Sequence, residues 1–517
     1  MFTLGGVTRW LPGQIPPRRP ASGSPVEGIA MTVTHTRQEP EAGLRPGAIG
    51  LSDALASTLS NMAPVEGIFI VLVIVAGAMG TLTPWAFLLG AIGIALTGWN
   101  VAQLARRIPS AGSYVGFAYH GGGAIRRSWA KPAAAFTFYL SLLAGPITVA
   151  AVVVFLGSWL QSAAGLPNVW WLVIALAAIA LTSPIVLRGI VASAKTALLF
   201  FAIEAGGLLL ISVIVLLRSG GAVGAPLHAH GGTPGGWGGI VGITFATAVS
   251  GFIGWENSAS LAEEIRQPRK VIPVAILGSI AVVALLYLIA TWAAVSGYVH
   301  WKGVTAGTAR LGSLTNAAPF VELADHYAPW LHWGVVAIGV ISPAACYLAS
   351  ITACSRWTFA SARGGLLPRR LARVSSRTAV PAPAVLLWMA VIAALCVIPY
   401  FMLHGNAVTV AAYEAGIGTV PLLMVYVLIS AVTPVYIWRH DRASFRVTAH
   451  VLPSLAGVAV VGYGVYEFVL PDQPSPANTF WAYILTLVLL AAVAAAVAMR
   501  LRGPALARLG QVEAGND

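Results

Sequence analysis

Residues 59–69 read LSNMAPVEGIF, and residues 248–257 read AVSGFIGWEN. Each stretch places glycine and a carboxylate inside an apolar run that is long enough to cross a bilayer. A lipid-facing helix does not tolerate this pattern, because unpaired backbone groups and a charge are costly in hydrocarbon. Such breaks persist where they line a cavity, and a matched pair is typical of the binding site of a secondary transporter. The two stretches therefore predict a transporter with two broken helices.

The composition indicates a membrane protein. Of the 517 residues, 58% are hydrophobic and only 9% are charged, whereas soluble proteins carry about 25% charged residues. A bilayer core of about 30 Å requires about 20 apolar residues per helix. We therefore predict an all-α integral membrane protein with about twelve transmembrane helices and no separate soluble domain. The predicted spans are 50–76, 82–105, 132–162, 166–187, 193–217, 238–262, 272–298, 333–361, 383–403, 407–437, 449–470 and 478–499.

The basic residues are distributed unevenly between the two sides of the predicted membrane. With a cytoplasmic N-terminus, only Arg218, Lys302 and Arg310 of the 30 lysines and arginines fall outside. This asymmetry is the positive-inside pattern, and it explains the net charge of +13 without an acidic partner. It predicts a multi-pass protein of the cytoplasmic (plasma) membrane with both termini in the cytoplasm. It also argues against nucleic-acid binding.

The order of the spans predicts an inverted repeat. Spans one to five and six to ten overlay with opposite orientation, and each block opens with a broken helix. We expect a 5+5 transport core at residues 50–437, with repeat one at about 50–217 and repeat two at about 238–437. Helices eleven and twelve follow at 449–499. Residues 1–49 and 500–517 are expected to be cytoplasmic tails, the first disordered, and Met31 is an alternative start to Met1.

No metal site or cofactor is expected. Cys346, Cys354 and Cys396 lie in apolar runs without paired spacing, which favours small buried hydrophobic residues over a disulfide framework or metal ligands. His228 and His230 lie in a Gly-rich external stretch, where a flexible loop is favoured over metal binding.

Three motifs resemble those of a known family. Residues 254–273 read GWENSASLAEEIRQPRKVIP, residues 355–368 read SRWTFASARGGLLP, and residues 106–114 read RRIPSAGSY. Their order and spacing resemble the amino acid–polyamine–organocation (APC) permeases. The resemblance implies a ten-helix core with two appended helices, and proton- or exchange-coupled movement of amino acids or amines. Gly364, Ser250 and the Val65-Glu66-Gly67 sequence depart from the family pattern, so the resemblance does not determine the substrate.

In this family the unwound part of helix one exposes N–H groups that receive a substrate carboxylate, which implies this role for residues 62–68. A kinked helix without a ligand is the alternative. Glu66 would repel a carboxylate unless it is protonated, as burial favours, or it could pair with an ammonium or a structural partner. Phe252 and Trp255 would cover the substrate, or only pack against helices. The predicted substrate-binding residues are Met62, Ala63, Val65, Glu66, Gly67, Ile68, Ser250, Gly251, Phe252, Gly254 and Trp255.

Ion coupling is predicted at Glu204, Glu256, Ser350 and Thr352. Buried ionisable residues in membranes typically mark ion pathways, and Glu204 lies where some proton-coupled relatives carry an ionisable residue. A proton is therefore favoured over sodium, for which the two hydroxyls would be ligands. Glu414 is a further candidate, with a pore-lining role or an interhelical hydrogen bond as equal alternatives. A cytoplasmic gate, or alternatively a solvated charged face, is predicted from a cluster that comprises Glu263, Glu264, Arg266, Arg356 and Arg363.

The sequence thus predicts a permease that moves an amino acid by alternating access with proton coupling. An amine or polyamine permease or exchanger is the alternative. A membrane-embedded enzyme is disfavoured because no nucleophile, base or metal set converges. A channel is disfavoured because no repeated filter or charged ring is present. The expected partners are a small molecule, the proton and the lipid bilayer, and the oligomeric state is left open.

Overall fold

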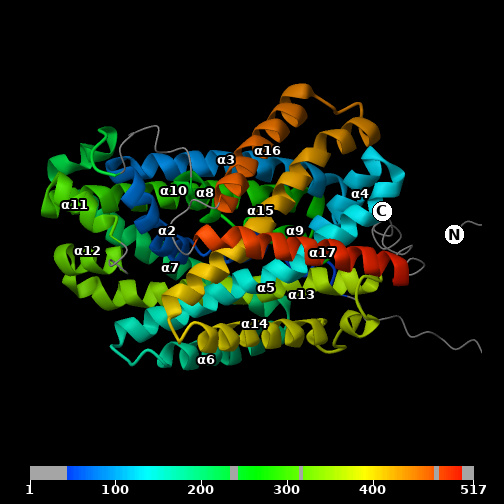
Figure 1. Ribbon diagram of the computed structural model, residues 1–517, viewed down its shortest axis with the longest axis horizontal. Coiled ribbons are helices and arrows are strands. Elements are labelled where there is room, and N and C mark those ends of the chain that lie inside the picture. Colours follow the sequence, from blue (N-terminus) through cyan, green and yellow to red (C-terminus); the bar gives the residue numbers. More distant parts are fainter. Residues whose placement is uncertain (1–43, 233–242, 314–317, 471–476, 503–517) are drawn as a thin grey trace, which may run out of the picture. The chain divides into compact units, whose positions relative to one another are not determined.

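A computed structural model describes residues 44–232, 243–313, 318–470 and 477–502 (Figure 1). Most of the predicted N-terminal and C-terminal tails lies outside the described residues. Within the described ranges the regular structure is helical, apart from one isolated parallel bridge between Ile49 and Ile265. The predicted all-helical fold is therefore confirmed.

The first half of the described chain contains seven α-helices. They are α1 Leu51–Met62, α2 Pro64–Met79, α3 Thr83–Arg107, α4 Tyr114–Ile125, α5 Ala130–Ala163, α6 Trp170–Leu187 and α7 Ile190–Arg218. Short 3₁₀ turns connect several of them: η1 Gly80–Leu82, η2 Arg127–Trp129 and η3 Gly220–Leu227.

The second half begins with the interrupted segment and continues with long helices. Its α-helices are α8 Ile243–Ser250, α9 Asn257–Ser260, α10 Pro268–Lys302, α11 Val304–Leu311, α12 Pro319–Tyr327, α13 His332–Arg363, α14 Ala382–Met402, α15 Ala407–His440, α16 Leu452–Val469 and α17 Phe480–Arg502. The connecting turns are η5 Pro329–Leu331, η6 Arg369–Ala372, the π-helical η7 Val447–Val451 and η8 Ala477–Thr479.

Ten helical stretches of the described chain are long and apolar enough to cross a membrane. The first, Leu51–Arg107, has 57 residues and contains two predicted spans. The predicted sixth span is absent from the ten because its helical pieces, α8 and α9, are short. One span is thus missing because of the second break, and two spans are counted as one because α2, η1 and α3 follow one another directly. The twelve-span count and the repeat boundaries stay predictions.

Apolar packing positions the broken helices in the centre of the largest buried cluster. This cluster joins α2, α3, α8 and α10, with Leu72, Phe87, Val249 and Val283 among its fully buried members. Phe87 and Tyr287 meet edge to face, with ring centroids 5.4 Å apart. A second cluster joins α5, α6, α13 and α14, of which α6 and α14 run side by side (Figure 1). Buried residues at both breaks therefore belong to the first of these two clusters.

The last two helices pack on the outside of this arrangement. α17 lies along α5, and α16 packs against α3, α8 and α15 (Figure 1). Their bounds agree with the predicted eleventh and twelfth spans, and neither contributes to the breaks.

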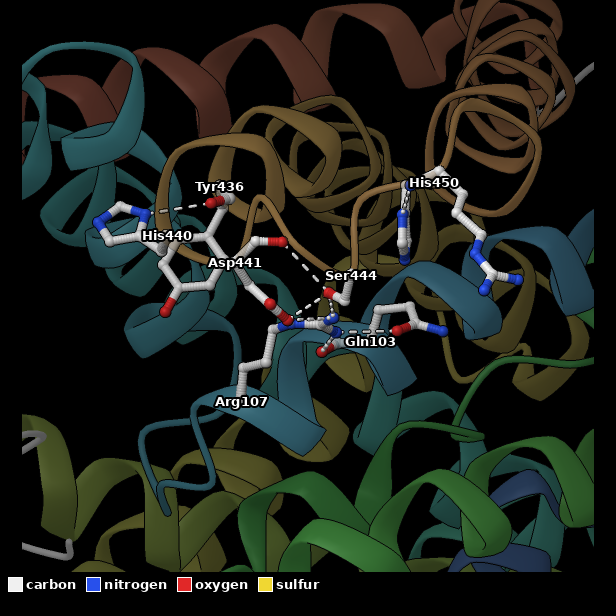
Figure 2. A network of polar contacts seen from close by, with 8 residues as sticks. Gln103, Arg107, Tyr436, His440, Asp441, Ser444 and His450 are labelled. Carbon is white, nitrogen blue, oxygen red and sulfur yellow. Dashed lines mark hydrogen bonds and ion pairs between the residues drawn. The ribbon is translucent and has the colours of Figure 1, made fainter.

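A polar network fastens the loop between α15 and α16 to the end of α3 (Figure 2). The Arg107 guanidinium donates to Asp441 Oδ2 at 2.8 and 3.0 Å and to Gln103 Oε1 at 2.9 Å. Ser444 contacts the same carboxylate. The Ser444 hydroxyl, followed by the Arg107 side chain, holds the pKa of the Asp441 carboxyl below its ordinary value. This loop is therefore tied down by ionic contacts at the arginine-rich end of α3.

Candidate functional site

The first break is a single residue. α1 ends at Met62, Ala63 adopts the left-handed conformation with φ 43° and ψ 64°, and α2 begins at Pro64. Proline lacks an N–H and suits the first position of a helix, so it ends the preceding helix and starts the next. Within residues 62–68 only Ala63 is non-helical, so the implied carboxylate site would consist of this residue and the first turn of α2, and it stays a prediction.

The N–H groups at the start of α2 face protein groups. The N–H of Glu66 donates to Ser342 Oγ of α13 at 3.2 Å, and that of Gly67 donates to the Ala63 carbonyl at 2.8 Å. The Glu204 carboxyl of α7 lies beside the backbone of Val65 and the Ser342 hydroxyl. The positive end of a helix attracts such an anion. The site expected to bind a substrate carboxylate therefore lies next to the Glu204 carboxyl of the protein.

Glu66 and Glu204 form a buried acidic pair. Their side chains are 5% and 0% exposed, and each carboxyl lies within electrostatic range of the other. Oε2 of Glu66 accepts no hydrogen bond from a described residue, and the Glu204 oxygens lie close to the Ser342 hydroxyl and the Val65 N–H without reaching hydrogen-bond geometry. Two carboxylates in one buried site disfavour double ionisation. The pair can therefore accept a proton or a cation.

Ser342 was missed by the sequence analysis, although it contacts the backbone of Glu66 and neighbours Glu204. Its sequence signal is weak, because a serine in an apolar helix ordinarily bonds its own backbone. Tyr287 of α10 was also missed. Its hydroxyl donates to the Gly251 carbonyl at 2.7 Å and lies so close to Gly67 that a Cβ there would overlap it. Gly67 is therefore required for the close approach of α2 and α10.

Asn61 connects the two breaks. Its amide nitrogen donates to the Gly254 carbonyl at 3.1 Å, and its Oδ1 accepts from Ser350 Oγ of α13 at 2.6 Å. The Cys346 thiol donates to the Asn61 backbone carbonyl at 3.2 Å. Cys346 is therefore more than the small buried hydrophobic residue expected from the sequence, since it binds a carbonyl freed by the break.

The second break extends over residues 251–256, between α8 and α9. Gly254 has φ 104°, a conformation that suits glycine alone, and a Cβ there would lie 2.5 Å from the Asn61 carbonyl oxygen. Glu256 ends this segment and accepts a hydrogen bond from the Tyr426 hydroxyl of α15 at 2.8 Å. Unlike the acidic pair, Glu256 thus has a protein partner.

A cavity of about 1320 Å³ lies at the breaks. It extends to the exposed residues Ser162 and Asn168 between α5 and α6, and to His332 at the start of α13. Among the described residues that border it there is no lysine or arginine. Of the predicted substrate-binding residues, those that border it are Met62, Ala63, Glu66, Gly67, Ser250, Gly251 and Gly254.

Four predicted substrate-binding residues do not border the cavity: Val65, Ile68, Phe252 and Trp255. Phe252 packs edge to face against Tyr287, with ring centroids 4.9 Å apart, and Trp255 packs against Tyr426 at 5.0 Å. Both aromatic side chains are fully buried. In this conformation both rings pack on the side of the break that does not border the cavity, against Tyr287 and Tyr426.

Other aromatic residues border the cavity instead. Phe69 of α2 lies one turn after Glu66, and its ring centroid is 5.0 Å from that of Trp159 of α5. Phe155 also borders the cavity, and its ring centroid lies 5.8 Å from that of Trp159. The Trp159 indole donates to the Val336 carbonyl at 3.0 Å, which fixes its ring. For Phe69 the sequence signal is its spacing of three residues from Glu66, which places both on one face of the helix.

The predicted ion-coupling residues separate into distinct places. Glu204 belongs to the acidic pair, and Glu256 bonds Tyr426. Ser350 borders the cavity and bonds Asn61, whereas Thr352 pairs with Ser193 of α7 at 2.9 Å and does not border the cavity. The additional candidate Glu414 is buried, does not itself border the cavity although its neighbours Ala412 and Ala415 do, and makes no hydrogen bond to a described residue.

The predicted gate residues form ion pairs at the arginine-rich end of α13. Arg356 Nε donates to Glu264 Oε2 at 2.9 Å, with both side chains buried, and Arg363 pairs with Glu263. Arg266 instead donates to the Gly47 carbonyl at 2.8 Å. None of these four paired residues borders the cavity, although Ser260 and Trp357 near them do.

The segment before α1 contacts the same part of the molecule. The Ile49 N–H donates to the Glu264 carbonyl at 3.1 Å, and the Arg266 N–H donates to the Ile49 carbonyl at 2.9 Å. The last residues of the predicted disordered tail, 44–49, thus have defined contacts.

Comparison with known proteins gives two transporters. A methylthioribose transporter from Bacillus subtilis (strain 168) is 27% identical over 252 residues, which are 48% of this chain and 49% of the relative. The mitochondrial cationic amino acid transporter 3 of Arabidopsis thaliana is 29% identical over 194 residues, 38% of this chain and 29% of the relative. The chain therefore aligns with half or less of each relative's length.

The family comparison covers far more of the chain. The family described as "Amino acid permease" matches residues 49–492, which include both breaks, the acidic pair and the ion pairs at the end of α13. The chain belongs to the amino acid permease family, within the APC superfamily.

Proposed function

We propose that the protein is a proton-coupled secondary transporter in the cytoplasmic membrane, and that it moves an amino acid whose ammonium group binds at Glu66. The observation that carries this proposal is the acidic pair at the cavity. Glu66 borders the cavity, Glu204 lies behind it, and no lysine or arginine borders the cavity among the described residues. A cationic group is therefore the natural partner of Glu66.

The role of Glu204 follows from its position. It is fully buried and does not border the cavity, so a substrate in the cavity meets Glu66 first. Because two buried carboxylates are not readily ionised together, an ionised Glu66 that pairs with an ammonium leaves the proton of the pair on Glu204. Release of both on the same side of the membrane would carry substrate and proton together.

The conformation supports alternating access. The cavity opens at the end of α13 that carries His332 and is closed at the other end by Glu264–Arg356 and Glu263–Arg363. With both termini cytoplasmic, as the arginine distribution favours, this is an outward-facing state. Inward opening would then require both ion pairs and the contacts of Ile49 to separate.

The aromatic residues at the cavity fit the same substrate. Phe69 follows Glu66 by one turn and packs against Trp159. Aromatic faces attract ammonium groups and equally receive apolar side chains. A substrate with an ammonium at Glu66 and an apolar remainder against these rings would match the lining.

Uptake into proteoliposomes tests the proposal. Radiolabelled amino acids should accumulate saturably when the medium is more acidic than the lumen, and Glu66→Gln should weaken substrate affinity roughly a hundredfold because a buried charged hydrogen bond is lost. Glu414→Gln removes another buried carboxyl, which does not border the cavity, and should leave the affinity unchanged. If Glu66→Gln transports with wild-type affinity, the ammonium does not bind there.

A carboxylate-free amine is the second candidate substrate. It is favoured by the start of α2, where the N–H groups of Glu66 and Gly67 already donate to Ser342 and Ala63. A substrate carboxylate would also meet Glu204 beside Val65. Competition between an amino acid and its decarboxylated amine distinguishes the candidates, because stronger inhibition by the amine would favour this second one.

A further inference from the structure

A second cavity, of about 320 Å³, lies between α3 and α10, apart from the breaks. It is an apolar groove with one charged residue at its end. Its lining residues, which define the α3–α10 groove, are Trp99, Ala102, Gln103 and Arg106 of α3, and Pro273, Val274, Leu277 and Gly278 of α10.

The groove follows one stripe on each helix. Trp99, Gln103 and Arg106 recur at intervals of three and four residues, so they lie on one face of α3. On α10 the same spacing joins Pro273 and Leu277, and it continues backward to Lys270, an exposed residue one turn before Pro273. Because α3 ends at Arg107 and α10 begins at Pro268, Arg106 and Lys270 mark the same end of the groove.

The apolar wall is fixed by a contact of its largest member. The Trp99 indole N–H donates to the Ala449 carbonyl in η7 at 2.7 Å, so the ring is held in place. Val274 is 51% exposed within the groove although it is apolar. In a multi-pass membrane protein, this arrangement offers an apolar chain a preformed site at the helix surface.

The two neighbouring arginines of α3 differ in their partners. Arg107 bonds Asp441, Ser444 and Gln103 (Figure 2). Arg106 is exposed and makes no hydrogen bond or ion pair with any residue in the described ranges. The groove thus ends in a cation that the described protein does not neutralise.

The acidic residues between α9 and α10 do not supply a counter-ion to Arg106. Glu263 and Glu264 pair with Arg363 and Arg356. Lys270 adds a second positive charge, and the positive end of the α10 dipole lies at the same place. The charge at this end of the groove therefore complements an anion.

We propose that the α3–α10 groove binds one acyl chain of a bilayer phospholipid, with its anionic headgroup held between Arg106 and Lys270. The chain lies along Trp99, Val274 and Leu277, and the headgroup phosphate meets the two cations. A headgroup that is anionic overall is selected over a zwitterionic one, since both charged groups at the groove's end are positive. Basic pockets between membrane helices are suited to such lipids.

Native mass spectrometry of the detergent-solubilised full chain tests this site, with phosphatidylglycerol and phosphatidylcholine of the same acyl chains. Wild type should retain phosphatidylglycerol preferentially. Each of Arg106→Gln and Lys270→Gln should weaken its binding about fivefold, because one cation near an anionic lipid is lost. The double variant Arg126→Gln with Arg127→Gln removes two cations outside the groove and should bind as wild type does.

A steric variant tests the apolar part independently of charge. Val274→Trp fills the groove from an exposed position, so the fold should tolerate it, as thermal unfolding would verify. It should reduce binding of both lipids. Equal wild-type retention of the two lipids, or undiminished phosphatidylglycerol binding in the Arg106, Lys270 and Val274 variants, would overturn the proposal.

Discussion

The two interrupted helices differ in how their carboxyl groups are satisfied. At the first break a single residue, Ala63, separates α1 from α2, and Glu66 lies next to Glu204 without a cationic partner among the described residues. At the second break residues 251–256 are non-helical, and Glu256 receives a hydrogen bond from Tyr426. Both carboxyls border the same cavity.

This difference indicates a division of roles. A buried acid whose protein partner is in place serves the structure, whereas an acid without one is available to a ligand or proton. Under the proposed function, the first break binds and couples, and the second break shapes the cavity. Under this division the role of Glu256 is to position the second break against α15 and not to couple the proton.

The largest expected effect comes from neutralising the two acids separately. Glu204→Gln should abolish accumulation driven by a pH gradient while substrate exchange partly persists, because no proton is bound and released in each cycle. Glu256→Gln should keep gradient-driven accumulation, since an amide still accepts a hydrogen bond from Tyr426. Parallel uptake and counterflow assays in proteoliposomes measure both activities.

Tyr426→Phe complements Glu256→Gln, because it removes the hydrogen bond that Glu256→Gln keeps and leaves the Glu256 carboxyl in place. It should resemble Glu256→Gln in pH dependence. Normal accumulation by Glu204→Gln, together with its loss in Glu256→Gln, would reverse the comparison and assign coupling to the second break.

A smaller effect is expected from the backbone of the second break. Gly254→Ala places a Cβ 2.5 Å from the Asn61 carbonyl oxygen at φ 104°, and should cost about 1–3 kcal/mol or more of folding free energy. Gly251→Ala is the control, since the nearest atom to its Cβ would be 3.5 Å away, an ordinary contact. Thermal unfolding of the purified variants measures the difference, and equal stability of the two would contradict the described geometry.

The sequence predicted both breaks from glycine and carboxylates inside apolar runs, and most helices from their length. It did not predict that Ala63 alone would form the first break, because a left-handed alanine has no local signal. Asn61 carries a local sequence signal, since an amide inside an apolar span is costly without a partner. Ser342 and Tyr426 carry little local signal, because their partners come from helices far along the chain.

The aromatic residues show the same limit. Phe252 and Trp255 were predicted near the substrate from their position in the broken segment, but the side of a non-helical segment on which a side chain lies cannot be derived from periodicity. Phe69 and Trp159 border the cavity because regular helices carry them there. Periodicity is informative where the chain is helical and uninformative within the break itself.

The smallest effect should come from the network at the end of α3. This network serves as a reference because none of its residues borders the cavity at the breaks. The Ser444 hydroxyl and then Arg107 lower the pKa of Asp441 from its ordinary 3.8. A carboxyl with a lowered pKa stabilises the folded state above its ordinary pKa, and this contribution is lost as the pH falls through the lowered value. Asp441→Asn should therefore lower the Tm slightly near neutral pH, by less than Gly254→Ala, and the difference from wild type should vanish as the pH falls below about 4. Transport should be unchanged, and Ser444→Ala should shift the Tm in the same direction. A Tm difference that grows in acid, or a transport defect larger than that of Glu256→Gln, would show that this loop is coupled to the breaks and that the second break is not the only structural support of the cavity.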